Sequence, residues 1–130
     1  MVRDGRDQPS SELAYPVAPR RIRTMGTRAI VHLLLHAAVP ALLAWMFWRK
    51  RFLHAWGLLL LGWLIDLDHL VADPVYQPDR CSIGFHPLHT APAVALYGVL
   101  VVPRRTRLLA IGLLVHIALD AIDCVWMRHG

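Results

Sequence analysis

The stretch W-L-I-D-L-D-H, residues Trp63 to His69, ends a strongly apolar segment with two aspartates and a histidine. After a loop, H-P-L-H-T, residues His86 to Thr90, opens the next apolar segment with two more histidines. Ionisable side chains are costly in an apolar environment, so a group of them within apolar segments indicates a functional site. We therefore expect the rest of the chain to be arranged around these two segments.

Apolar segments account for most of the chain, because 56% of its 130 residues are hydrophobic. Four blocks can be drawn, each about 17 to 21 residues long, which is close to the length of a helix that crosses a bilayer. The blocks are Ala29 to Trp48, Leu53 to Ala72, Pro87 to Pro103, and Arg107 to Met127. The sequence thus predicts an all-α fold, an integral membrane four-helix bundle over residues 29–127, behind a disordered N-terminal tail of residues 1–28.

Other classes of protein fit the sequence less well. A soluble protein with buried helices would need a solvated face, and the run Leu58 to Leu61 is apolar on every side. A cleaved signal peptide would need small residues at its end, where Trp45 and Trp48 stand instead. Met25 is a plausible alternative start, which would remove most of the polar tail.

The net charge of +5 does not indicate a nucleic-acid partner, because the basic residues do not form one face. They lie in the N-terminal tail and in two predicted turns, Arg49 to Arg51 and Arg104 to Arg107. Membrane proteins keep such flanking charges in cytoplasmic loops. Counted from Met25, this rule places the two turns in the cytoplasm and the opposite end of the bundle outside it.

Polar side chains recur at one depth in all four blocks. Antiparallel spans bring the starts of the first and third blocks to the same side as the ends of the second and fourth. At about 1.5 Å per residue, nearly all of these side chains fall within about 12 Å of that boundary. They are His32, His36, Asp66, Asp68, His69, His86, His89, His116, Asp120 and Asp123.

Imidazoles and carboxylates without thiolate pairs are the ligands of a catalytic zinc ion or a related divalent ion. The predicted metal ligands are His36, Asp66, His69, His86, His89, His116 and Asp120. They could serve one ion with an open position, or two ions with a bridging water. The predicted catalytic bases are Asp68 and Asp123, and His32 is a supporting residue. Asp68 also fits a role in orienting a ligand histidine.

Motifs in all four blocks carry a family resemblance. H-L-L-L-H-A-A-V-P at 32–40, D-L-D-H at 66–69, C-S-I-G-F-H-P-L-H-T at 81–90 and I-G-L-L-V-H-I-A-L-D-A-I-D-C at 111–124 resemble small bacterial membrane proteins classed as domain of unknown function 6122. More distantly, the chain is similar to membrane-bound metal-dependent hydrolases, which have H-R-G-x-T-H-S in place of H-P-L-H-T. The resemblance implies a metal site in a multi-pass protein of the bacterial inner membrane.

The favoured function is a metal-dependent hydrolase that acts on a lipid or phosphoester substrate at the membrane surface, with the site facing the periplasm. Two alternatives stay open: a transporter of metal ions or protons, for which we find no internal repeat, and a non-catalytic metal-binding membrane protein. The oligomeric state is also open.

The two cysteines, Cys81 and Cys124, fall on the side of the predicted site. A disulfide, two free thiols and a cysteine metal ligand all fit this placement, since spacing alone does not distinguish them. A disulfide would require an oxidising compartment.

Overall fold

A computed structural model of the chain describes residues 26–71 and 80–129, and every regular element in this part is helical. The elements are α1 (Thr27–Phe47), η1 (Arg49–Arg51), α2 (Phe52–Leu60), η2 (Leu61–Val71), η3 (Pro87–His89), α3 (Ala91–Leu100) and α4 (Arg107–His129). The all-α prediction is confirmed for the described residues. Most of the predicted disordered tail lies outside them.

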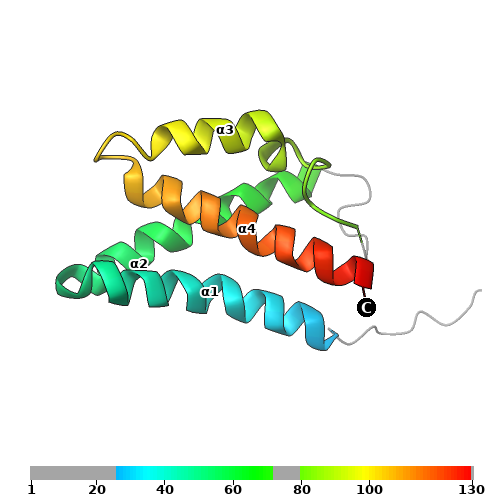
Figure 1. Cartoon of the computed structure of the whole chain (residues 1–130), viewed down its shortest axis with the longest axis horizontal. Helices are drawn as coiled ribbons and strands as arrows, with labels where there is room; N and C mark the ends of the chain where they lie inside the picture. Colours follow the sequence, from blue (N-terminus) through cyan, green and yellow to red (C-terminus); the bar gives the residue numbers. More distant parts are fainter. Residues whose placement is uncertain (1–25, 72–79, 130) are drawn as a thin grey trace, which may run out of the picture.

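The helical segments run antiparallel along the chain (Figure 1). α1 and α3 run one way, whereas α2 with η2 and then α4 run the other way. α4 lies at the centre and contacts α1, α2, η2 and α3. The start of α1, the end of η2, the start of α3 and the end of α4 therefore lie at one end of the molecule, as expected from the sequence.

α1 and α2 are held together by a small apolar cluster and one hydrogen bond. Ala44, Ala55 and Leu59 are buried between them. The Trp56 indole N–H donates to the backbone carbonyl of Ala37 at 3.2 Å. This pairing fixes α1 against the segment that leads to Asp66.

The second segment crosses α4 at very short range because both carry a glycine at the contact. A Cβ atom on Gly62 would lie 2.5 Å from the carbonyl oxygen of Gly112, and a Cβ on Gly112 would overlap the carbonyl of Leu59. Small residues permit such close approach, especially between helices in membranes. Asp66 and His116 each lie four residues beyond the glycine of their own element, so this contact sets their separation.

The second segment is not a single α-helix, as the sequence interpretation assumed. α2 ends at Leu60, and η2 continues it as a 3₁₀-helix of 11 residues. Such runs are rarely longer than three or four residues. With three residues per turn, Asp66 and His69 share a face, and Asp68 is rotated away from both by about a third of a turn.

The third predicted block is also interrupted. η3 follows His86, Thr90 is extended (φ −89°, ψ 160°), and only then does α3 begin. Pro87 and Pro92 occupy the first turns of η3 and α3, where the missing N–H has no helical partner to lose. With ten residues, α3 is about 15 Å long.

Two helices of the described part, α1 and residues Arg107–Arg128 of α4, are long and apolar enough to cross a membrane. This finding rests on length and composition, which the core helix of a soluble protein can share. α3 is apolar but shorter. Among the described residues, two helices are therefore long and apolar enough to cross a membrane, whereas the sequence predicted four spans.

A disulfide joins Cys81, in the loop before η3, to Cys124 near the end of α4, with Cα atoms 5.1 Å apart. Of the three states that the sequence leaves open, this one is present. By restricting the unfolded chain over a sequence separation of 43 residues, the link contributes about 4 kcal/mol at most. It holds the loop at the end of the bundle where the polar residues gather.

Candidate metal centre

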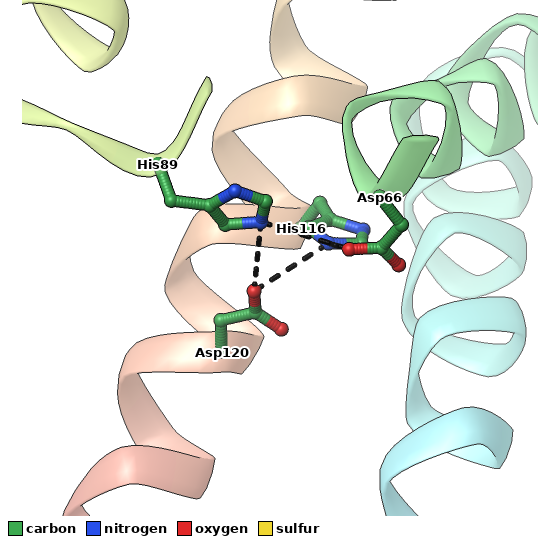
Figure 2. Close-up of side chains that lie close together, drawn as sticks. All are labelled: Asp66, His89, His116 and Asp120. Atoms are coloured by element: carbon green, nitrogen blue, oxygen red, sulfur yellow. Dashed lines mark hydrogen bonds and ion pairs between the residues drawn. The ribbon is translucent and has the colours of Figure 1, made fainter. Parts of the chain in front are cut away.

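Four side chains from three elements converge at the polar end of the bundle, and Figure 2 shows them pointing toward one another. We call them the first ligand group: Asp66 of η2, His89 of η3, and His116 and Asp120 of α4. One ligand atom from each lies within 4.8 Å of all the others. His89, His116 and Asp120 are buried. The arrangement joins residues separated by more than fifty positions.

Four of the six separations within the first ligand group lie close to those of a tetrahedral metal shell. Asp66 Oδ1 lies 3.1 Å from His116 Nε2 and 3.6 Å from His89 Nε2. Asp120 Oδ2 lies 3.1 Å from His89 Nε2 and 3.6 Å from His116 Nε2. Ligands about 2.0–2.1 Å from a zinc ion in a tetrahedron would lie about 3.3–3.4 Å apart. One divalent ion therefore fits between these four atoms.

Buried atoms without hydrogen-bond partners also indicate an ion. Buried polar groups nearly always have a partner, so orphaned atoms call for an explanation. Among the described residues they are His36 Nε2, His89 Nε2, His116 Nδ1, Asp120 Oδ2 and Asp123 Oδ1. His89 Nε2 and Asp120 Oδ2 both belong to the first ligand group, and a cation bound there would satisfy them.

Asp68 contacts the Nδ1 side of His89, opposite the Nε2 atom that faces the first ligand group. Its Oδ2 lies 3.2 Å from His89 Nδ1 and accepts the backbone N–H of Leu88 at 2.9 Å. With a proton on Nδ1, His89 presents the lone pair of Nε2 to the first ligand group. This carboxylate–histidine arrangement is the usual second sphere of a metal site. The position agrees with the orienting role predicted for Asp68, whereas its predicted role as a base stays a prediction.

The loop before α3 is shaped to place His89. Gly84 has φ +80°, a conformation that favours glycine, and its N–H donates to the His89 carbonyl at 3.1 Å. The Tyr97 hydroxyl donates to the Leu88 carbonyl at 3.0 Å. The loop and α3 thus hold η3 from both sides, so that His89 reaches α4.

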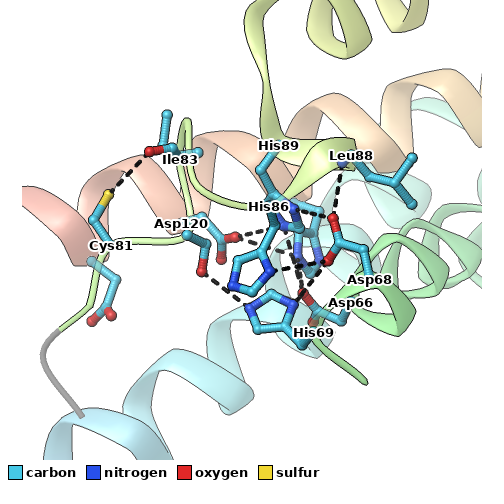
Figure 3. A network of polar contacts seen from close by, with 12 residues as sticks. Asp66, Asp68, His69, Cys81, Ile83, His86, Leu88, His89 and Asp120 are labelled. Carbon is cyan, nitrogen blue, oxygen red and sulfur yellow. Dashed lines mark hydrogen bonds and ion pairs between the residues drawn. The ribbon is translucent and has the colours of Figure 1, made fainter. Parts of the chain in front are cut away.

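His69 and His86, two predicted ligands, lie beside the first ligand group (Figure 3). Their rings stack with centroids 3.7 Å apart. His69 Nδ1 lies 3.0 Å from Asp68 Oδ1, and His69 Nε2 lies 3.3 Å from the hydroxyl of Ser82. Burial, and then the adjacent His69 ring, lower the pKa of His86, which favours its neutral form. Neither histidine belongs to the first ligand group, but His69 forms with Asp68 and His89 a further group that could hold a metal ion, and His86 Nδ1 lies 3.9 Å from Asp68 Oδ1.

A second ligand group lies on the other side of Asp120: His32 and His36 of α1, with Asp120 itself. The Nε2 atoms of both histidines lie 3.4 Å from Asp120 Oδ1. His36 was predicted as a ligand and His32 only as a supporting residue, yet the two are placed alike. Their spacing of four residues on one helical face was the signal in the sequence.

Asp123, one turn beyond Asp120, lies at the rim of the second ligand group. Its Oδ2 is 4.0 Å from His32 Nδ1, and its Oδ1 is 3.5 Å from Arg28 Nε. The sequence interpretation left Arg28 in the N-terminal tail and missed its place at the site. The available signal was again spacing, because Arg28 and His32 are four residues apart.

Comparison with known proteins identifies a family for the chain. The model of a family of unknown function matches residues 26–127, which include both ligand groups. No curated protein and no solved structure matches the chain. The match confirms the family predicted from the motifs of the four blocks, whereas the more distant similarity to membrane-bound hydrolases is not shown.

Proposed function

The chain belongs to the DUF6122 family of unknown function, and from its ligand groups we propose that it is a membrane-bound, divalent-metal-dependent hydrolase. One observation carries the proposal: four imidazole and carboxylate atoms from η2, η3 and α4 converge within 4.8 Å of one another, with the four His–Asp separations at 3.1–3.6 Å. Histidine with aspartate is the ligand set of hydrolytic zinc and related ions. Two carboxylates, Asp66 and Asp120, would offset the charge of one such ion.

A membrane location is supported by the surface of the helices. Leu34 of α1, Leu53 of α2 and Val99 of α3 are exposed by 63%, 73% and 66%. Ile122 of α4 is exposed as well. So much exposed apolar surface on every helix is unusual in a soluble monomer. We propose that lipid covers these faces.

The lengths of the helical segments also fit a location in the membrane. α1, with 21 residues, spans about 31 Å, close to the thickness of a bilayer core of about 30 Å. α2 and η2 together reach about 35 Å, because the 3₁₀ rise is about 2.0 Å per residue. The third crossing is shorter, and a bilayer can thin locally to accommodate it.

The proposed substrate is a lipid phosphoester. Arg28 supplies a cation at the rim for a phosphate group, and guanidinium groups bind phosphate well. A small cavity beside His36 and His116 is otherwise lined mainly by apolar side chains such as Leu59 and Trp63, and it has room for about one water molecule. Both features adjoin the ligand groups.

A divalent ion held by these residues would activate water and polarise the phosphoryl oxygen. In hydrolysis the water oxygen bonds to phosphorus, and the bond to the leaving alcohol breaks. The water proton passes to a base and then to the leaving oxygen. Asp123 suits this role better than Asp68, because Asp123 is partly exposed at the rim and Asp68 is occupied by His89 and Leu88.

Metal content and turnover test the proposal together. The full chain, purified in detergent and loaded with Zn²⁺ or Mn²⁺, should retain metal through gel filtration and hydrolyse bis-p-nitrophenyl phosphate or phosphatidic acid in vesicles. His89→Ala should lose metal from the first ligand group, and turnover should fall by at least 100-fold, about 2.7 kcal/mol in the barrier.

His54→Ala is the matched control, because His54 is an exposed histidine on α2 away from the polar end. It should keep both metal and activity. A metal-free wild-type protein would refute the proposal and favour a scaffold in which the histidines and aspartates only bond to one another. Bound metal without hydrolysis of either substrate would favour a non-catalytic metal-binding protein.

A further inference from the structure

The first ligand group offers four protein atoms, which would be enough to fill the tetrahedral shell of a bound ion. Asp66, His89, His116 and Asp120 supply four ligands, which is the pattern of a closed site. A hydrolytic ion keeps one position for water. The question for the proposed hydrolase is therefore where the reactive water binds.

Asp120 offers a second site through its other oxygen. Oδ2 faces His89 and His116, at 3.1 and 3.6 Å from their Nε2 atoms. Oδ1 faces His32 and His36, at 3.4 Å from each Nε2. The two carboxylate oxygens thus point into different ligand groups, which is the geometry of a bridging carboxylate.

His36 is set up as a ligand of this second group. Its Nδ1–H donates to the backbone carbonyl of His32 at 2.9 Å, so Nε2 carries the free lone pair. That atom is buried and has no hydrogen-bond partner. An unpartnered imidazole nitrogen aimed at a buried carboxylate oxygen fits a shared cation, because the cation would satisfy the nitrogen and bind the carboxylate oxygen as well.

The charges around the two groups also accommodate a second ion. Asp66, Asp68, Asp120 and Asp123 bring four negative charges, and Arg28 brings one positive charge. With neutral histidines, one divalent ion leaves the site at −1. Two divalent ions with one hydroxide bring it to zero.

We infer that His32, His36 and Asp120 hold a second divalent metal ion, bridged to the first by the Asp120 carboxylate, and that this second ion carries the reactive water. The inference rests on the proposed function and refines it. Three protein ligands leave the second ion with an open position. Arg28 and Asp123, the residues proposed to bind phosphate and accept the proton, lie beside this group, since Asp123 Oδ2 is 4.0 Å from His32 Nδ1.

Metal stoichiometry of the purified full chain tests the inference. After loading with Zn²⁺ and gel filtration, elemental analysis should find two ions per wild-type chain. His32→Ala should retain one ion, and His116→Ala should retain at most one. Asp120→Ala should lose both, because it removes the shared carboxylate. His54→Ala should keep two.

Electron paramagnetic resonance of the Mn²⁺-loaded protein gives a readout independent of activity. A carboxylate-bridged pair should show an exchange-coupled spectrum in the wild type and in His54→Ala. His32→Ala, whose partly exposed side chain makes the substitution mild for folding, should show the six-line spectrum of an isolated ion. His36→Ala should behave in the same way.

The outcomes separate this inference from the proposed function. One ion per wild-type chain, unchanged in His32→Ala and lost in His116→Ala, would overturn the second site and leave the first intact. No ion in the wild type would overturn both. Two ions with no coupling would overturn the bridge through Asp120.

Discussion

At the scale of single residues, Asp68 orients His89 toward the first ligand group. One of its carboxylate oxygens accepts hydrogen bonds from both His89 Nδ1 and the Leu88 amide. Asp68→Asn removes the charge and keeps the shape. We expect Zn²⁺ affinity to fall about 10–100-fold, the usual effect of losing such a partner, as measured by competition with a fluorescent chelator. Asp66→Asn, which alters a proposed direct ligand, should have a larger effect. Unchanged affinity with lost turnover would instead make Asp68 the catalytic base.

At the scale of elements, the contact between α4 and the second segment controls the width of the site. Gly112→Ala places a Cβ against the Leu59 carbonyl and should destabilise the protein by about 1–3 kcal/mol. Metal binding should also weaken, because Asp66 would move away from His116.

Gly57→Ala and Gly98→Ala are matched controls, because nothing lies within 4 Å of either new Cβ. Each should be neutral or stabilising by up to about 1 kcal/mol. Thermal unfolding in detergent with and without Zn²⁺ measures both effects, and a Gly112→Ala protein as stable as its controls would contradict this account.

At the scale of the whole molecule, the disulfide and the basic turns favour the same orientation. Cys81 and Cys124 need an oxidising compartment, and the turns at the opposite end carry the positive charges that favour the cytoplasm. We therefore expect alkaline phosphatase fused after the last residue to be active, and a fluorescent protein fused there to be dark. Fusions truncated in the turn after α3 should give the reverse. A fluorescent C-terminal fusion would place the site in the cytoplasm and contradict the orientation.

Much of the fold could be predicted because helical length and apolar composition are local properties. The blocks around α1 and α4 correspond closely to single helices, and short turns make α1 antiparallel to α2 and α3 antiparallel to α4. The 3₁₀ course of η2 and the break at Thr90 could not be predicted in this way. Both depend on packing against α4 and on the loop that carries His86, which hydrophobic periodicity does not record.

For the site, the sequence by itself determined which residues are available: histidines and aspartates at one end of the chain's apolar blocks, spaced to share helical faces. Only the tertiary structure decided which of these residues form each ligand group. It placed His89 and His116 on one oxygen of Asp120, put His32 and His36 on the other, and set His69 and His86 beside the Asp68 support. The physical reason is that spacing fixes direction within one helix, whereas distances between helices depend on contacts such as that of Gly62 with Gly112.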